Sequence, residues 1–589
     1  MFRRLLVFYS WILVPVLTCT VLPAQESGMA SPALIAPGSM PTPTPNLTSY
    51  ADDEAKVDFR RTTVLVQVPV VVSDKSGHHI HNLTKDQFRV LENGKEQKIA
   101  AFEEIVIDKS TSPSAAAPGT FRNLAFDTRH PVNISVVAID TVNTPFLDQA
   151  NARSALAKYL ADNLEPGQAM SLVQISSRGL KVAQELTSDP NVLIRTLKQL
   201  SGEVPALEGV DPDIRSALMG DRLGAVNGCY PSIVENFLRI GDAYAQFKQE
   251  QAIETTLHSF LQIAWFLSGF PGRKSLIWAT GGFPFDLSSP SIVPGGGFSS
   301  LYEQAMKALN ESQVAVYPVD VRGLVSMSPG ANARVGGGAA YARRIEHDSW
   351  SHLDEVATLK QFAAMTGGRA IYNSGDLAGA FRRVADDSSS YYMLGYYLDT
   401  KNRNPGWRRL DVKVAQKSVE VRSRSGFLVT NTTMDPQKTR DTDFAFAVNS
   451  PFESTGIPIW LQWQDVSAEN QTKAQGRKRI SFAMHLAGDS VSTEGDQNAI
   501  DLDFVAVISA KNKKDAVGKP IEHRMKVQLS PQTLAMVRAQ GMKYSSTVEL
   551  PVGSYQVRFV VRDNQRQDRQ RLRTTEFGLM RKRLLQRAR

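Results

Sequence analysis

The sequence predicts a multidomain α/β plus β protein. A doubly wound, Rossmann-like α/β domain is flanked by β-modules and followed by a C-terminal β-sandwich. Between residues 130 and 388, apolar runs such as ISVVAI (134–139) alternate with amphipathic segments, the pattern of a parallel sheet covered by helices. On both sides of that region apolar residues recur at every second position, which is the period of a β-strand. The length of 589 residues also exceeds what one hydrophobic core supports.

The first residues have the pattern of an export signal. Arg3 and Arg4 precede a mostly apolar stretch, and Leu-Pro-Ala at 22–24 is a suitable cleavage sequence. We therefore expect a signal peptide at 1–24 and an exported protein that is periplasmic, secreted or at the cell surface; an uncleaved anchor is the alternative. Residues 25–55, rich in Pro, Ser, Thr and Ala, predict a disordered linker. No later segment is apolar over the length of a membrane span, so we expect no transmembrane segment after cleavage.

Cysteine usage and charge narrow the function classes. Cleavage after Ala24 removes Cys19 and leaves Cys229 alone, which excludes an internal disulfide and a thiolate metal site. Residues 558–589 hold eleven Lys or Arg and three Asp or Glu, so this end accounts for the whole formal net charge of +8. Residues 581–589 form a basic tail, either for polyanions or simply solvated. Nothing resembles a reader of nucleic acids.

Residues 56–125 predict an N-terminal β-module. In TTVLVQVPVVV (62–72) valines alternate along one face, and FRVLENGKEQKIAAFEE (88–104) places Asn93–Gly94 between two short strands, a hairpin signature. Three histidines, His78, His79 and His81, lie in the turn region between these strands. They are either a metal site or exposed turn residues, and the sequence leaves both open.

Residues 130–388 predict the α/β domain. Its expected strands are 134–139, 169–176, 181–186, 275–282, 314–320 and 369–373, and its expected helices are 148–163, 190–200, 247–267, 300–311, 350–365 and 375–386. Two long loops, 202–230 and the Gly-rich 321–347, interrupt this pattern. A carboxylate, Asp140, stands at the end of the first buried strand, and open α/β sheets place ligand sites at that end.

The remaining chain predicts β-structure. Residues 389–430 form a β-hairpin module, in which 408–415 is expected to pair with 418–424. A linker at 430–442 leads to the C-terminal β-sandwich at 443–580, with expected strands at 478–487, 499–510, 523–530 and 546–562.

The order of these segments resembles a von Willebrand factor type A domain, and more narrowly the VWFA-related domain family of Acidobacteria and similar bacteria. The resemblance covers roughly residues 60–430. It is carried by VVVSDKSGHHIHNLTKDQFRVLENGKEQKIAAF (70–102), SVVAIDTVNT (135–144), LKQFAAMTGGRAIYN (359–373) and YYMLGYYLDTKNRNPGWRRLDVKVAQKSVEVRSRSGF (391–427). The C-terminal β-sandwich rests on its pattern alone.

The resemblance implies a site for Mg²⁺ or Mn²⁺ at the top of the sheet, built from Asp-x-Ser-x-Ser, a distant Thr and a further Asp. Asp140 and Thr144 match two of these five positions. Val142 replaces the first Ser, Asn143 is out of register, and Gly281 follows Thr280 where the second Asp would stand. A hard cation that prefers about six oxygens would bind this degenerate site weakly. The alternative is that Asp140 caps the following backbone.

The function expected from these patterns is non-enzymatic binding or adhesion to a protein or envelope-surface ligand. The expected binding face comprises Asn143, Thr280, Gly281 and Gly282 beside the degenerate metal site. A structural or assembly factor of the cell envelope is the alternative. A hydrolase is less favoured, because the sequence has no G-x-S-x-G, no H-E-x-x-H and no G-K-[ST] phosphate loop.

Overall fold

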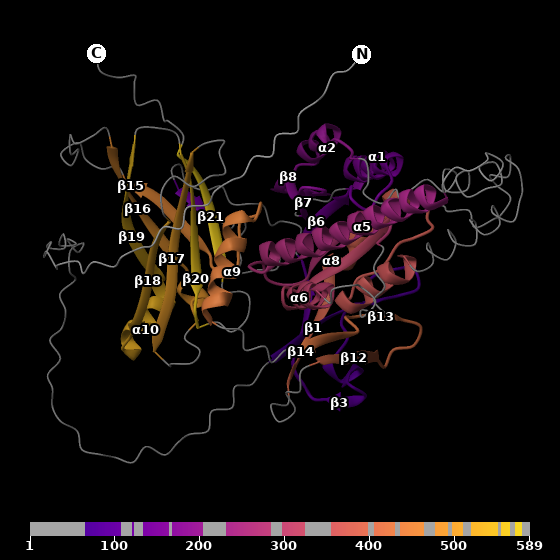
Figure 1. Ribbon diagram of the computed structural model, residues 1–589. Helices are drawn as coiled ribbons and strands as arrows, with labels where there is room; N and C mark the ends of the chain where they lie inside the picture. The colour runs from indigo at the N-terminus through magenta and orange to yellow at the C-terminus, as the bar shows by residue number, and fades with distance from the viewer. Residues whose placement is uncertain are drawn as a thin grey trace, which may run out of the picture. The chain divides into compact units, whose positions relative to one another are not determined.

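The computed structural model shows a mixed α/β chain that consists mostly of sheets (Figure 1). It describes residues 65–107, 120–122, 133–163, 168–203, 231–283, 297–323, 355–398, 406–429, 436–464, 477–492, 498–510, 520–551, 555–565 and 572–579. The expected signal peptide, the linker at 25–55, the basic tail and most of the loop 202–230, with Cys229, lie outside the described residues. No described helix is long and apolar enough to cross a membrane.

A five-stranded mixed sheet forms the centre of the α/β region, in the order β10-β9-β6-β7-β8. Four strands are parallel, and only β8 runs antiparallel, against β7. The strands are β6 (Asn133–Asp140), β7 (Gln168–Ser176), β8 (Gly179–Thr187), β9 (Lys274–Thr280) and β10 (Val314–Asp320). The strand expected at 369–373 is reduced to a single parallel bridge between Val319 and Ile371.

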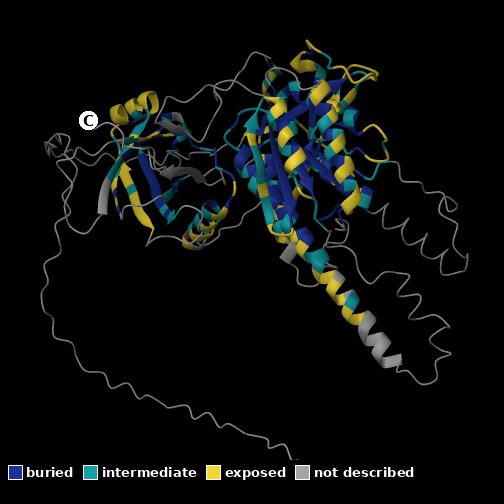
Figure 2. Cartoon of the chain, turned by 90° about the horizontal axis from the view of Figure 1, so that it is seen from above, coloured by how far each residue is buried: buried dark blue, intermediate teal, exposed yellow. Residues whose placement is uncertain are grey.

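Helices cover both faces of this sheet, because both faces of its parallel strands are apolar. Val136, Leu276 and Val316 point to one core, together with α5 (Pro231–Leu267), α6 (Gly297–Glu311) and the helix at 355–366. In each strand, the residues next to these point to the opposite face and form a second core. This core is closed by α1 (Phe146–Asn163), α2 (Pro190–Gln199) and α8 (Leu377–Ser389). Figure 2 shows these strands buried beneath helices whose outer faces are exposed. The long helix expected from 247 begins at Pro231.

Two distant segments of the chain together build the β-structure beside the sheet. Its two sheets have the orders β13-β1-β11-β4 and β14-β12-β2-β3, and they share one apolar core. The strands are β1 (Leu65–Ser73), β2 (Phe88–Glu92), β3 (Lys95–Gln97), β4 (Ile99–Val106), β11 (Ser390–Tyr397), β12 (Gly406–Val414), β13 (Glu420–Arg422) and β14 (Gly426–Val429).

The hairpin expected at Asn93–Gly94 is confirmed. Glu92 pairs with Lys95, and both turn residues have positive φ, 48° and 80°, as a two-residue hairpin turn requires. The hairpin expected between 408–415 and 418–424 is wrong. β12 pairs instead with β14, which follows it in the chain, and with β2 from the N-terminal segment, whereas β13 pairs with β1.

The C-terminal region holds two further four-stranded sheets, β19-β16-β15-β5 and β18-β17-β20-β21, with a common apolar core. Their strands are β5 (Thr120–Arg122), β15 (Ile459–Gln464), β16 (Arg477–Leu486), β17 (Ala499–Ala510), β18 (Ile521–Gln528), β19 (Met542–Pro551), β20 (Tyr555–Asp563) and β21 (Leu572–Leu579).

Two expectations for this region are corrected. The single strand expected at 546–562 is two strands, because Pro551 ends β19 and β20 begins only at Tyr555. The linker expected at 430–442 contains the start of a helix, α9 (Pro436–Asn449), whose Ala447 packs against Val505 and Val560.

A buried polar contact joins the α/β region to the neighbouring β-structure. Arg422, on β13, forms an ion pair with Asp387, on α8, and both side chains are nearly buried. The backbone N–H of Arg273 donates to the hydroxyl of Tyr391, and the Arg273 guanidinium donates to the Tyr317 hydroxyl and to the Gly367 carbonyl oxygen. Buried charges are tolerated only when they are paired in this way.

Candidate functional site

The candidate site lies where the carboxyl ends of β6 and β9 meet. These strands are parallel neighbours, with Ile139 opposite Ala279, so Asp140 and Thr280 end at the same edge of the sheet. Such edges are where open α/β sheets bind ligands. The structure therefore brings together Asp140, Asn143, Thr144, Thr280, Gly281 and Gly282, but all six are buried. The four residues of the expected binding face, Asn143, Thr280, Gly281 and Gly282, are therefore not exposed for contact with a partner.

The Asp140 carboxylate is completely buried and accepts hydrogen bonds from its own chain at both oxygens. Oδ1 accepts from the backbone N–H groups of Val142 at 3.1 Å and Asn143 at 3.0 Å. Oδ2 accepts from Asn143 Nδ2 at 2.8 Å and from Trp278 Nε1 at 2.9 Å, and the Thr280 hydroxyl lies 3.1 Å away. Burial raises the pKa of Asp140, and the hydrogen bonds from Asn143, Trp278 and Thr280 oppose that rise.

Thr144 and Gly281 close the same edge. The Thr144 hydroxyl oxygen accepts a hydrogen bond from the Gly281 backbone N–H at 2.9 Å. A Cβ on Gly281 would stand 2.7 Å from Pro145 Cδ and 3.0 Å from Thr144 Cα, so only glycine allows the two loops to approach this closely. Gly282 has φ 154°, and a Cβ there would meet the Glu355 carboxyl group.

These residues do not fit the octahedral Mg²⁺ or Mn²⁺ site that the family resemblance implies. A hard cation needs several oxygens with free lone pairs turned toward one point. Both oxygens of Asp140 are already turned toward N–H and O–H donors, the Thr144 hydroxyl accepts from Gly281, and Val142 supplies no oxygen. An ion would have to break this network, so the metal assignment at Asp140 and Thr144 stays a prediction that the geometry does not favour. The capping alternative matches the contacts.

A second charged group on this edge was missed by sequence reasoning. Asp320 ends β10 and is completely buried, and the Arg322 guanidinium donates to both of its oxygens at 2.9 Å. Arg322 also donates to Glu355 Oε2 at 2.7 Å. The signal was present in the sequence as an aspartate at the end of a buried strand with an arginine two residues later.

Exposed apolar side chains begin directly after Thr144. Pro145 is exposed, Phe146 is 52% exposed and Leu147 is 78% exposed at the start of α1. Gln149 fixes this helix start. Its side-chain amide nitrogen, Nε2, donates to the carbonyl oxygens of Thr144 and Glu203 at 2.8 and 2.7 Å. The edge thus presents apolar groups on a backbone held by buried hydrogen bonds, which is a surface suited to binding a protein.

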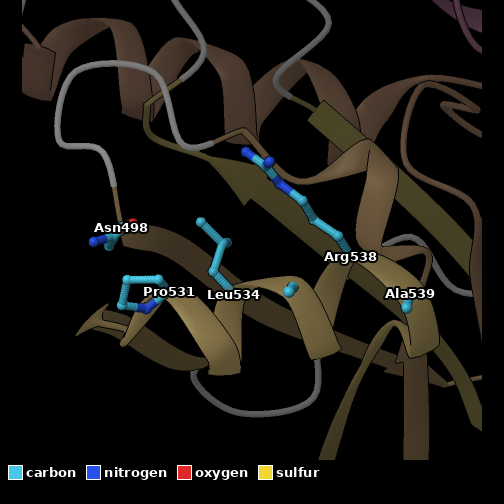
Figure 3. Close-up of a pocket in the computed structure, with 6 residues that line it drawn as sticks. Asn498, Pro531, Leu534, Arg538 and Ala539 are labelled. Atoms are coloured by element: carbon cyan, nitrogen blue, oxygen red, sulfur yellow. The ribbon is translucent and has the colours of Figure 1, made fainter.

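A separate hollow lies in the C-terminal region (Figure 3). It is lined by Asn498, Pro531, Leu534, Ala535, Arg538 and Ala539, mostly from α10 (Pro531–Gln540). Among the described residues that line it, Arg538 is the single charged side chain.

Comparisons with known proteins do not identify a family for this chain. No protein-family model matches this chain, and no curated protein matches it either.

Proposed function

We propose that this chain is an exported, non-enzymatic binding protein that engages a protein or envelope-surface ligand. The proposed contact surface is the edge at the carboxyl ends of β6 and β9, called the binding edge here and defined by the exposed residues Pro145, Phe146 and Leu147; Gly281 and Gly282 at the same edge are buried. The observation that carries the proposal is the exposure of Phe146 and Leu147 on a rigid edge. Exposed apolar groups beside a fixed backbone favour association because little conformational entropy is lost on binding.

The proposal includes a von Willebrand type A-like assignment for the α/β domain and a β-sandwich assignment for the C-terminal region. The mixed sheet with helices on both faces supports the first assignment. Two four-stranded sheets with a common apolar core support the second. Fold alone does not define function, so the binding edge carries the functional part of the proposal.

The binding edge, as proposed, works without a bound ion. In the related ion-dependent type of site, a cation would link the partner's carboxylate to the protein. Here the buried Asp140 holds the loops together through hydrogen bonds from Trp278 and Asn143. The degenerate site is therefore proposed to act as a structural support for the edge, and the partner contacts the apolar residues above it.

The test places a photo-reactive amino acid at position 147 of the full chain and exposes it to an envelope fraction of the host. The matched control carries the same group at Met536, which is 58% exposed on α10. The proposal expects a discrete cross-linked partner at 147 only, unaffected by a chelator and lost in the F146S variant. Equal labelling at both positions would contradict it. A partner that co-purifies stoichiometrically and persists in F146S would favour the envelope assembly factor instead.

A further inference from the structure

The turn that follows β1 is held by hydrogen bonds and places histidines beside a sheet. Asp74 Oδ1 accepts hydrogen bonds from the backbone N–H groups of Ser76 at 2.8 Å and His78 at 2.9 Å. The chain then returns to the sheet, because Ile80 N–H donates to the Val72 carbonyl oxygen at 2.9 Å. His79 forms an antiparallel bridge with Ser73. The positions of the following side chains are therefore fixed by backbone contacts.

This turn lies against β11 and β4, where it meets Glu104. Tyr392 on β11 is the register partner of Glu104 on β4. The Tyr392 hydroxyl donates to the Ile80 carbonyl oxygen at 2.7 Å, and the His79 ring stacks on the Tyr392 ring with centroids 5.4 Å apart. His79, His81 and Glu104 come together although Glu104 is 23 residues beyond His81 in sequence.

The ligand-type atoms of these three side chains converge. His81 Nδ1 lies 2.7 Å from Glu104 Oε1, and His79 Nε2 lies 3.7 Å from the same oxygen. One ligand atom from each residue lies within 4.8 Å of the others. Ligands on a tetrahedral ion with bonds of about 2.0–2.1 Å stand roughly 3.3 Å apart. The two contacts with Glu104, at 2.7 and 3.7 Å, lie on either side of that spacing.

Among the described residues, His79 has no hydrogen-bond partner for its ring. Its side chain is only 10% exposed, and neither ring nitrogen makes a hydrogen bond in the described part of the chain. Buried polar groups are normally satisfied, and a bound ion is one of the recognised explanations for an exception.

We propose that His79, His81 and Glu104 form a Zn²⁺ site, with a fourth position open to water or to a ligand from a partner. Two imidazoles and one carboxylate are a donor set that suits zinc and leaves that position free. A backbone contact supports the carboxylate, because the N–H of Asn82 donates to Glu104 Oε2 at 2.9 Å and leaves Oε1 for the ion. This site is distinct from the Asp140 edge, and it does not depend on the proposed binding function.

The neighbouring histidine provides a matched control. His78 belongs to the same turn, but its side chain is 83% exposed and lies 3.5 Å from Asp74. It is not part of the three-residue group. A variant at this position changes the number of histidines in the turn without changing the proposed ligands.

The experiment uses the full chain without a polyhistidine tag, stripped of metal, and titrates Zn²⁺ in competition with a chromophoric chelator. Co²⁺ is titrated separately, because a tetrahedral site gives it strong visible absorption. The variants are H79Q, H81Q, E104Q and the control H78Q. Thermal unfolding of each metal-free variant shows whether it still folds.

The proposal expects one Zn²⁺ for each chain, with affinity reduced at least tenfold in H79Q and in H81Q and retained in H78Q. It also expects Zn²⁺ to raise the unfolding temperature of the wild type and of H78Q only. Absence of saturable Zn²⁺ binding by the wild type would overturn the proposal, and so would unchanged binding in an H79Q/H81Q double variant. Loss of binding in H78Q equal to that in H79Q would assign the ion to a non-specific histidine-rich turn and overturn it as well.

Discussion

Trp278 Nε1 donates a hydrogen bond to Asp140 Oδ2 at 2.9 Å, and this contact joins two parallel strands whose residues are 138 positions apart. Trp278 is completely buried among Phe260, Phe283 and Phe362, so its N–H group needs an acceptor inside the core. Asp140 supplies that acceptor and also holds the loop that leads to α1. A residue at a ligand-binding position of the sheet is thus part of the structural core.

Replacement of Asp140 by alanine should destabilise the fold strongly. The substitution leaves the indole N–H of Trp278 without its acceptor and removes one of the two acceptors of the Asn143 amide, which keeps Thr256. Buried unsatisfied groups cost about 1–3 kcal/mol each. We expect a loss of about 3 kcal/mol or more in urea unfolding, equal with and without Mg²⁺. D189A is the control, because Asp189 only caps α2 and its loss should cost about 1 kcal/mol. A loss that appears only when Mg²⁺ is present would contradict the structural role.

A methyl group at Gly281 should also destabilise the edge. The new Cβ would stand 2.7 Å from Pro145 Cδ, and the Thr144 backbone next to it cannot move without disturbing the start of α1. We expect G281A to lower the free energy of unfolding by about 1–3 kcal/mol. The comparison is T280S, which keeps the hydroxyl that faces Asp140 and should cost less. An unchanged G281A protein would show that the two loops do not meet as described.

Lys274 should make stability depend on pH. Lys274 is only 2% exposed, its ammonium group donates to the Phe270 carbonyl oxygen at 2.7 Å, and burial lowers its pKa to about 7. Because the unfolded chain keeps this proton up to a pH near 10.5, it binds more protons than the folded chain above pH 7. The free energy of unfolding therefore rises with pH between about pH 7 and pH 10.5, and burying the charged Lys274 costs most below pH 7.

K274M removes the buried amine, so the variant should gain free energy of unfolding relative to the wild type at low pH. This difference should shrink by about 3 kcal/mol between about pH 6 and about pH 9. Urea unfolding of the variant and the wild type at both pH values measures the difference. K307M is the control, because Lys307 is partly exposed on α6 and pairs with Glu311. A gain that is the same at both pH values would show that Lys274 is not held in a buried, deprotonating environment.

The buried pair of Arg422 and Asp387 should show strong coupling. Removing only the guanidinium in R422M leaves a buried carboxylate without its partner, which typically costs about 3–5 kcal/mol. Burial already raises the pKa of Asp387 against the opposing effects of Arg422 and Arg273. The double variant R422M/D387N should recover part of the loss. A double-mutant cycle in urea measures the coupling, and additive losses would mean that the two side chains do not interact.

The local patterns of the sequence predicted most strands and helices of the α/β region. The period of the run ISVVAI, and that of the stripe containing Leu257, Phe260 and Leu261, is visible in neighbouring residues. The strand forms where expected, and the helix ends where expected but begins earlier, at Pro231. The pairing of β12 with β2 was not predictable, because β2 lies more than 300 residues away in the sequence. Short segments around Pro551 were also misassigned, since one alternating pattern ran across two strands.

The composition of the candidate site was predictable, but its chemistry was not. Asp140 was placed at the edge because parallel strands end there, and the family resemblance placed Thr144, Thr280 and Gly281 beside it; the structure has these residues in contact. Their role depends on Trp278, whose side chain lies in the middle of an apolar strand and reads as a core residue in the sequence. Likewise, His79 and His81 were visible as turn histidines, whereas Glu104 joins them only through the register of β4 with β11.

The measurement that tests the account most directly is a calorimetric titration of Mg²⁺ and Mn²⁺ into the full chain. It is made in the H79Q/H81Q background, so that the turn site contributes no heat, and beside a T144V variant. The account predicts no saturable binding up to millimolar ion, because the Asp140 oxygens already accept hydrogen bonds from Val142, Asn143 and Trp278. Saturable binding that T144V abolishes would contradict it and would restore an ion to this edge of the sheet.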